Sequence, residues 1–217
     1  MINWIINVSL FFVLCILVRA ICLLIQLKQE AHSLNQTATH TNKLKTLIIL
    51  GSGGHSTEML RLVKTLNPEI FKPKMYILAS SDSKSKEKLL EMENHLGRQT
   101  RYETYDIPRS RKVHQSYITS IFTTLFSFIY CVPLMLKIRP DIILCNGPGT
   151  CIPICLIAFV MRVLFISNCV LVFVESTCRV KTLSLSGIIL YYFADIFLVH
   201  WEELSKKYNR AKYIGRF

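Results

Sequence analysis

The fold is decided by one stretch of the chain, Leu47-Ile48-Ile49-Leu50-Gly51-Ser52-Gly53-Gly54-His55-Ser56-Thr57-Glu58-Met59-Leu60. Its first four residues form an apolar run with the length of a buried strand, and a glycine-rich turn follows at once. Apolar residues then recur at helical spacing as far as Leu66. Because such a turn exposes backbone N–H groups at the start of a helix, it is where α/β proteins hold a phosphate. The stretch therefore predicts an α/β fold and a phosphorylated ligand.

The rest of the chain continues this alternation of strand and helix. Strands are predicted at residues 45–50, 75–79, 102–107, 141–145, 170–175 and 195–200, and helices at residues 55–66, 83–96, 116–137 and 151–165. Strands that alternate with helices pair in parallel through right-handed crossovers, and ligands then lie at the carboxyl ends of the strands. Since the chain has 217 residues, we expect a single Rossmann-like, doubly wound sheet at residues 44–217.

The N-terminal segment is predicted to be a transmembrane helix at residues 4–27, followed by a polar linker at residues 28–43. The run is apolar except for Arg19 and a few Asn, Ser and Gln residues, and it is long enough to cross a hydrocarbon core of about 30 Å. A cleaved signal peptide is the alternative, but no Lys or Arg precedes the run and no small-residue cleavage site ends it. Because the basic residues lie at or beyond its C-terminal end, the body is expected to face the cytosol.

The composition indicates which partners to expect. The formal net charge is +12, and the basic residues are spread over the body without the basic run or the aromatic motif of a nucleic-acid module. We therefore expect an anionic membrane surface and no nucleic acid. The eight cysteines lie mostly in apolar runs without Cys-x-x-Cys spacing, which is typical of reduced core residues rather than of disulfides or zinc ligands. Residues 118–136 and 151–166 compete as further spans, but helices packed on the sheet or lying on the leaflet are the more economical interpretation.

The first glycine turn, Gly51-Ser52-Gly53-Gly54, is predicted to approach a diphosphate, with the hydroxyls of Ser56 and Thr57 nearby. It has neither the lysine of a Walker loop nor the spacing of a nicotinamide-binding fingerprint. A tight turn that binds nothing is the alternative, although three glycines in four positions exceed what a turn needs. His55 is a candidate general base or phosphate donor, and a helix residue with no task is an equal interpretation.

A second turn, Asn146-Gly147-Pro148-Gly149-Thr150, follows the strand predicted at residues 141–145 and precedes an apolar helix. Two such turns at one sheet edge would form one cleft, although all these residue types are ordinary turn formers. Glu175, at the next strand end, is either a ligand or base for a sugar hydroxyl or a solvated strand end. Arg109 and Arg111 belong to a basic cluster that suits either a diphosphate or the membrane surface.

Four motifs together resemble a known family: Gly51-Ser52-Gly53-Gly54-His55, Ile107-Pro108-Arg109-Ser110-Arg111, Cys145-Asn146-Gly147-Pro148-Gly149-Thr150-Cys151 and Val174-Glu175-Ser176. They resemble the membrane-anchoring subunits of the eukaryotic UDP-N-acetylglucosamine transferase of asparagine-linked glycosylation, and the similarity runs from the anchor to the C-terminus. The resemblance implies the N-terminal, acceptor-binding half of a GT-B glycosyltransferase, similar to the bacterial lipid-linked N-acetylglucosaminyltransferase of peptidoglycan synthesis. A separate soluble, donor-binding catalytic subunit would complete the enzyme.

The resemblance also implies a reaction and a place. The enzyme would add the second N-acetylglucosamine (GlcNAc) to dolichyl-diphosphate-GlcNAc at the cytosolic face of the endoplasmic reticulum membrane. His55 would deprotonate the acceptor 4-hydroxyl or bind phosphate, residues 146–150 would help form the acceptor cleft, and residues 213–217 would pack against the partner. No metal or cofactor is expected, because N–H groups at helix ends can stabilise a departing diphosphate.

Two other classes of function stay open at this point. A self-contained nucleotide-dependent enzyme would need an acidic ribose-binding residue after the second strand, and Asp82 is the candidate, although it also suits a helix cap. A non-enzymatic scaffold that recruits a soluble protein to the membrane is the third class.

Overall fold

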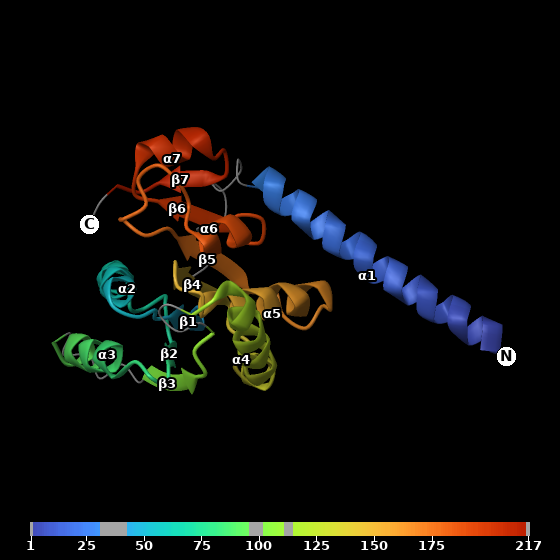
Figure 1. Cartoon of the computed structure of the whole chain (residues 1–217), viewed down its shortest axis with the longest axis horizontal. Helices are drawn as coiled ribbons and strands as arrows, with labels where there is room; N and C mark the ends of the chain where they lie inside the picture. Colours follow the sequence, from blue (N-terminus) through green and yellow to red (C-terminus); the bar gives the residue numbers. More distant parts are fainter. Residues whose placement is uncertain (1, 31–42, 96–101, 111–114, 216–217) are drawn as a thin grey trace.

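Seven parallel strands form one sheet in the computed structural model, which describes residues 2–30, 43–95, 102–110 and 115–215. The strands are β1 (Thr46–Ile49), β2 (Lys74–Ala79), β3 (Tyr102–Ile107), β4 (Ile142–Asn146), β5 (Val170–Val174), β6 (Ile196–Val199) and β7 (Ala211–Tyr213). Their spatial order is β3-β2-β1-β4-β5-β6-β7, so the order reverses between β1 and β4 (Figure 1). The predicted doubly wound sheet is confirmed, and its topological switch point lies between β1 and β4.

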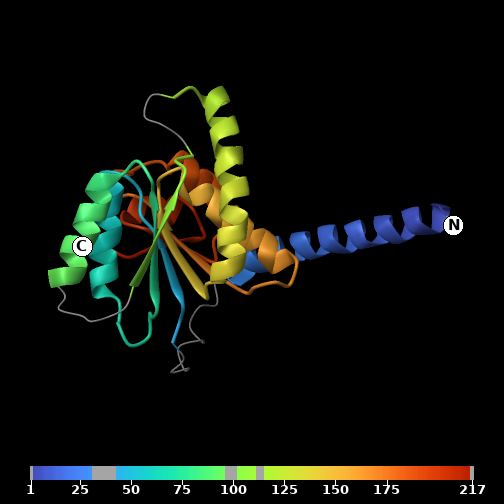
Figure 2. The ribbon, with the colours of Figure 1, turned by 90° about the horizontal axis from the view of Figure 1, so that it is seen from below.

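Helices cover both faces of this sheet. The helices are α1 (Ile2–Glu30), α2 (Gly54–Thr65), α3 (Ser83–His95), α4 (Tyr117–Ile138), α5 (Cys151–Val163), α6 (Leu185–Leu190) and α7 (Glu202–Lys207). Figure 2 shows α2 and α3 on one side of the sheet and α4 and α5 on the other. Successive residues of β1 point to opposite faces, so Leu47 packs in the cluster under α4 and α5 while Ile48 packs in the cluster under α2 and α3. This burial on both faces explains the continuous apolar run of β1.

The C-terminal part of the sheet differs from the sequence prediction. The elements α6, α7 and β7 were not predicted, because each has only three to six residues and too few positions to show a period. β7 pairs in parallel with β6, and the backbone N–H of Ile214 donates to the carbonyl of Val199 (3.1 Å). The segment predicted to contact a partner therefore begins inside an edge strand, and residues 216 and 217 lie outside the described residues.

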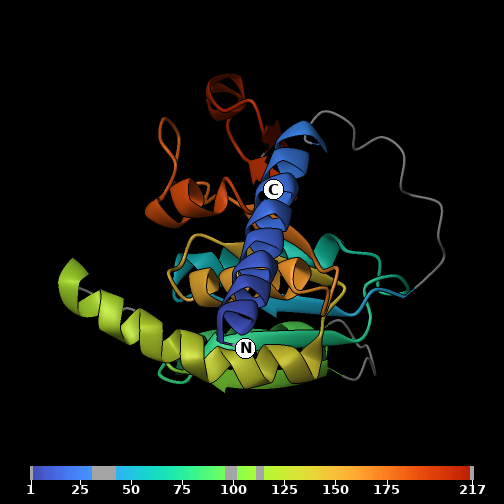
Figure 3. The ribbon, with the colours of Figure 1, turned by 90° about the vertical axis from the view of Figure 1, so that its right-hand side faces the viewer.

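α1 projects from the body as a helix of 29 residues (Figures 1, 2 and 3). Its segment Ile6–Lys28 is long and apolar enough to cross a membrane, and none of its most apolar window is buried. This N-terminal helix supports the predicted membrane anchor. Ile118–Ile138 in α4 passes the same test of length and composition. Most of the linker predicted at residues 28–43 lies outside the described residues.

Candidate functional site

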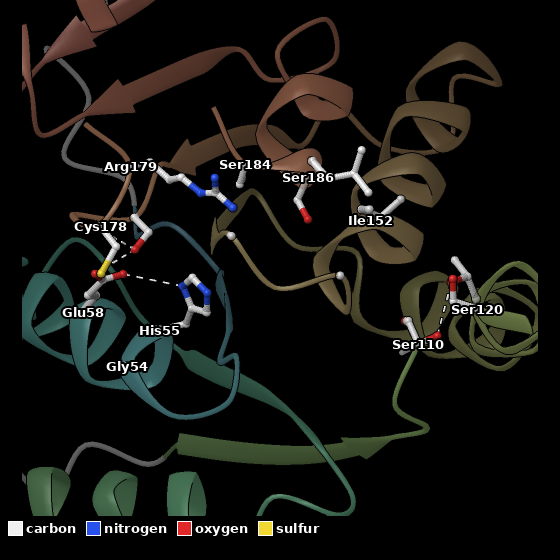
Figure 4. A pocket seen from close by; sticks show the side chains of 15 residues that line it. Gly54, His55, Glu58, Ser110, Ser120, Ile152, Cys178, Arg179, Ser184 and Ser186 are labelled. Atoms are coloured by element: carbon white, nitrogen blue, oxygen red, sulfur yellow. Dashed lines mark hydrogen bonds and ion pairs between the residues drawn. The ribbon is translucent and has the colours of Figure 1, made fainter. Parts of the chain in front are cut away.

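A cavity of about 610 Å³ opens at the carboxyl ends of β1 and β4, beside the switch point of the sheet. Five segments line it: the start of α2, Ser110 in the loop between β3 and α4, the N-terminal half of α4, the turn between β4 and α5, and the loop between β5 and α6 (Figure 4). Ligands of doubly wound sheets bind at this place because the strand ends diverge there and leave a crevice. The volume lies within the range of pockets that hold small molecules.

The first glycine turn brings the start of α2 to the cavity. Gly53 adopts the left-handed φ of 66°, which lets the chain turn from β1 directly into α2 at Gly54. No atom lies within 4 Å of where a side chain of Gly54 would begin, so the first turn of the helix borders open space. His55 follows, and its half-buried ring points toward the cavity (Figure 4). The backbone N–H groups and partial positive charge of α2 therefore face a potential anion.

The second glycine turn packs directly against the first. Asn146 donates from Nδ2 to the backbone carbonyl of His55 (2.7 Å), across 91 positions of sequence. A Cβ atom at Gly147 would lie 2.9 Å from Cε1 of His55, and one at Gly51 would overlap the ring of Pro148. These two glycines are required for close approach of the turns. The structure thus brings both turns to one cavity, with Gly54, His55, Gly147 and Gly149 on its wall.

Glu58 forms a pair with His55 that the sequence analysis missed. The two residues are three positions apart on α2, and Oε2 of Glu58 lies 3.6 Å from Nδ1 of His55. The other oxygen, Oε1, accepts hydrogen bonds from Oγ of Ser176 (3.0 Å) and from the backbone N–H (3.1 Å) and hydroxyl of Thr177. Spacing of three on a helix was the one sequence signal that could have found the pair.

The charge state of Glu58 follows from these contacts. Burial raises the pKa of Glu58, but the contact with His55 and the hydrogen bonds from Thr177 and Ser176 outweigh burial and bring the pKa down to about 2. Glu58 is therefore a fixed carboxylate at neutral pH. Nδ1 of His55 faces this carboxylate at 3.6 Å, which leaves Nε2 for proton transfer.

The loop between β5 and α6 adds a cation and hydroxyls to the cavity wall. Arg179 is exposed there, and Ser184 and Ser186 lie beside it (Figure 4). The oxygen of Ser184 also caps α6 by accepting a hydrogen bond from the backbone N–H of Gly187 (2.9 Å). Sequence reasoning did not select Arg179, because no local pattern distinguishes it from the other basic residues of the chain.

Glu175 does not face the cavity. Its side chain is only 1% exposed and accepts hydrogen bonds from the backbone N–H (2.8 Å) and hydroxyl (3.1 Å) of Ser184 and from the backbone N–H of Ser176 (3.0 Å). Burial raises the pKa of Glu175 despite these bonds. The interpretation as a solvated strand end is wrong, because the carboxylate is enclosed by the loop that it organises. Glu175 is also not on the cavity wall, and its role as a ligand or base for a sugar hydroxyl stays a prediction.

The other described residues that were predicted for the site do not line the cavity. The buried hydroxyl of Ser56 donates to the carbonyl of Gly51, and Thr57 accepts a hydrogen bond from Lys88 (2.9 Å) on the α3 side. Thr150 is buried at the start of α5. Ser52 and Arg109 are half-buried outside the cavity lining, and Arg111 lies outside the described residues. Ser56 thus stabilises the first turn from within.

The fold is that of one half of a GT-B-type structure. The chain resembles MurG of Acinetobacter baumannii, with a TM-score of 0.52 and 16% identity over 73% of this chain and 42% of that chain. It also resembles a UDP-N-acetylglucosamine 2-epimerase, with a TM-score of 0.52 and 18% identity over 76% of this chain and 43% of that chain. At such low identity the likeness shows the fold alone. The chain spans less than half the length of either solved structure.

Sequence comparison gives the family. The family model described as "Oligosaccharide biosynthesis protein Alg14 like" matches residues 46–217. The chain is 45% identical over 185 residues to the UDP-N-acetylglucosamine transferase subunit ALG14 of Mus musculus, covering 82% of this chain and 85% of that one. It is 42% identical over 184 residues to the corresponding subunit of Homo sapiens, with the same coverage. The chain belongs to the Alg14 family, which confirms the resemblance drawn from the four motifs.

Proposed function

We propose that this chain is the membrane-anchored, acceptor-binding subunit of a heteromeric N-acetylglucosaminyltransferase. The enzyme transfers GlcNAc from UDP-GlcNAc to dolichyl-diphosphate-GlcNAc at the cytosolic face of the endoplasmic reticulum membrane. The observation that carries the proposal is the convergence of the His55–Glu58 pair and both glycine turns on one cavity, in a chain whose relatives are named as transferase subunits.

The size of the chain supports a partner. The chain matches only 42% of MurG, and its seven strands form one sheet. A GT-B enzyme closes two Rossmann-like domains over its substrates, and the relatives of this chain are named as transferase subunits, which favours a second domain supplied by another chain. The partner proposed here is a soluble, donor-binding catalytic subunit that this chain recruits to the membrane.

The cavity suits a diphosphate. The starts of α2 and α5 both lie at its wall, and each supplies partial positive charge. The first turn of α2 also has N–H groups without a side-chain cap, whereas at α5 the N–H groups of Cys151 and Ile152 donate to the carbonyls of Pro148 and Gly149. Arg179 adds a guanidinium, which forms strong charge-assisted hydrogen bonds to phosphate oxygens. These groups bind one diphosphate at the subunit interface, either that of the acceptor lipid or that of the donor. In the second case they oppose the negative charge that develops when UDP departs.

The His55–Glu58 pair supplies a general base in this proposal. The acceptor 4-hydroxyl attacks the anomeric carbon of the donor sugar, forming a new C–O bond while the bond from that carbon to UDP breaks. Nε2 of His55 takes the hydroxyl proton, and Glu58 stabilises the resulting imidazolium. A positioned base of this kind contributes about 10² to 10⁴ in rate.

The partner requirement is tested by measuring transfer from UDP-GlcNAc to a dolichyl-diphosphate-GlcNAc acceptor. We expect product only when the purified chain and the soluble subunit are mixed. Product from this chain alone would favour a self-contained enzyme. Recruitment of the soluble subunit that persists after substitution of both glycine turns, without any effect of these substitutions on transfer, would favour a scaffold.

The role of His55 is tested with His55→Ala. We expect a complex that still assembles and whose rate falls by about 10² to 10⁴. An assembled His55→Ala complex with the full transfer rate would contradict the proposed role.

A further inference from the structure

One side chain joins the projecting helix α1 to the body. Nε of Arg19 donates to the carbonyl of Val163 (2.9 Å), and Nη2 donates to the carbonyl of Arg162 (3.1 Å). The guanidinium also lies over the ring of Phe165, with Cζ 3.2 Å from the ring centroid. Since α5 ends at Val163, these carbonyls belong to its last turn, where carbonyls lack the usual partner four residues on; that of Arg162 also accepts from the backbone N–H of Phe165 (3.2 Å). Arg19 therefore caps α5 and fixes one point of α1 to the body.

The surroundings of α1 change at Arg19. From Arg19 onward, one stripe at helical spacing is partly or fully buried, and it ends at Leu27, which is 3% exposed. Before Arg19, the described apolar side chains are exposed almost throughout, with Leu10, Phe11 and Phe12 each more than 60% exposed. The segment after Arg19 thus lies along the body, and the segment before it leaves the body.

Exposed apolar side chains lie on the body next to this junction. Phe165 is 75% exposed although Arg19 stacks on it, and Leu164 beside it is exposed as well. Exposed apolar side chains beside an arginine suit contact with a leaflet, where the apolar groups meet lipid and the guanidinium stays at the polar level.

The outer face of α4 is apolar, as expected of a helix surface that contacts lipid. Apolar side chains at helical spacing are exposed along it: Ile118, Ile121, Phe122, Leu125, Phe126 and Ile129. The hydroxyl of Ser127 points inward and donates to the carbonyl of Pro108 (3.1 Å), and Ser120 and Thr124 line the cavity. A helix at a water-exposed surface has the opposite arrangement, with polar residues outside.

The direction of α4 decides how this face meets a bilayer. α4 runs across the direction of α1 in both Figure 2 and Figure 3. When α1 crosses a bilayer, α4 consequently extends along the leaflet instead of through it, as an interfacial helix does.

We propose that the membrane surface lies at Arg19, so that α1 crosses the bilayer only with the residues before Arg19. Phe165 and the outer face of α4 then rest on the leaflet. This inference depends on the membrane anchor of the proposed function. The 17 residues from Ile2 to Val18 rise about 26 Å, which spans a hydrocarbon core of about 30 Å with slight local thinning. Hydropathy alone extends the span to Lys28.

This placement gives α4 a function at the site. Its apolar face contacts lipid while Ser120 and Thr124 on the other side line the cavity. A phosphate carried on a lipid therefore reaches the cavity from the leaflet, along α4.

Two native cysteines on α1 test the proposal, because Cys15 precedes Arg19 and Cys22 follows it, and both are exposed. The full chain carrying Cys178→Ser is placed in phosphatidylcholine nanodiscs and treated with a charged, membrane-impermeant maleimide. We expect Cys22 to react within about tenfold of its rate in detergent, and Cys15 to react at least about 100-fold more slowly than in detergent, since thiol reactivity follows access to the reagent. Additional Cys15→Ser and Cys22→Ser changes assign the labelled position. Protection of both cysteines would place the surface near Lys28 and overturn the proposal, as would labelling of Cys15.

The matched variant Arg19→Lys tests the clamp itself. Lysine keeps the interfacial charge but lacks the planar fork that bridges two carbonyls and stacks on a ring. We expect α1 to move deeper into the bilayer and the labelling of Cys22 to fall by about tenfold, both in Arg19→Lys and in Arg19→Ala. Native labelling of the Arg19→Lys chain would show that charge alone sets the depth and would refute the clamp. Labelling requires neither substrate nor partner, so its outcome is independent of the transfer assay.

Discussion

The substitution Gly147→Ala tests whether the second glycine turn acts by positioning His55. The added methyl group would lie 2.9 Å from Cε1 of His55 and 3.5 Å from its Nδ1. Carbon atoms in contact prefer about 3.5 to 4.0 Å, so the ring must move by roughly 0.6 to 1 Å. His55 is half-buried and has room to swing toward the cavity, so the substitution displaces the ring without unfolding the domain.

A displacement of this size has a calculable cost. A misplacement of about 1 Å in a reacting group costs about 10² in rate. We therefore expect the transfer rate of the assembled complex to fall by about 30- to 100-fold, which corresponds to about 2 to 3 kcal/mol of transition-state stabilisation. The free energy of unfolding should change by less than about 1 kcal/mol, because the partly exposed ring can move aside.

A double-mutant cycle in the transfer assay separates this effect from others. If Gly147 acts through His55, then Gly147→Ala adds nothing to the loss already caused by His55→Ala. Gly149→Ala is the matched control, because it adds a methyl group to the same turn where no atom lies within 4 Å. If Gly149→Ala lowers the transfer rate, it does so by disturbing the bound ligand and not His55. That loss should therefore persist in the His55→Ala background. Additive losses for Gly147→Ala and His55→Ala would refute the reasoning.

Three further predictions concern groups around the site. Glu58→Gln should lower the transfer rate, and it should also remove an acid-sensitive part of the free energy of unfolding. The pKa of Glu58 is depressed from 4.5 to about 2. Ionised Glu58 therefore contributes at most about 3 kcal/mol above pH 4.5, and this contribution is lost as the pH falls toward 2. Unfolding measured between pH 6 and pH 2.5 checks this, and equal slopes for both proteins would contradict it. Gly187→Ala should cost about 2 kcal/mol in thermal unfolding, because its methyl group would overlap the enclosed Glu175 carboxylate, whereas Gly149→Ala should cost almost nothing. Asp195→Asn should cost about 3 kcal/mol in urea unfolding. Arg162 donates to both Asp195 oxygens (2.8 and 2.7 Å), and in the variant its largely buried charge would lack a counter-ion. An unchanged urea midpoint would argue against this prediction.

The C-terminal residues belong to the sheet as well as to a predicted contact surface. The sequence analysis predicts that residues 213–217 contact the partner, but Tyr213 belongs to β7 and Ile214 packs on the core. Deleting this segment would therefore disturb an edge strand as well as a contact. Substitution of Tyr213, which is 52% exposed, tests the partner contact with less effect on the sheet.

Much of the fold was accessible from the sequence because its signals are local. The apolar run of β1 and the glycines after it fix a strand and a turn within a few residues, and the recurring alternation of strands and helices implies a parallel sheet. The two glycine turns were recognisable for the same reason. Short elements such as β7 were not predicted, because three residues are too few to show a hydrophobic period.

The sequence by itself determined the parallel α/β body, the apolar N-terminal helix and the presence of two glycine turns. Only the tertiary structure decided which side chains meet. Glu58 and Ser176 are 118 positions apart, and the sheet brings them within hydrogen-bonding distance, while it encloses Glu175 next to Ser176 in the chain. The physical reason is that residue spacing fixes backbone conformation over one turn or strand, whereas contacts between elements depend on strand order and on the shape of the packed core.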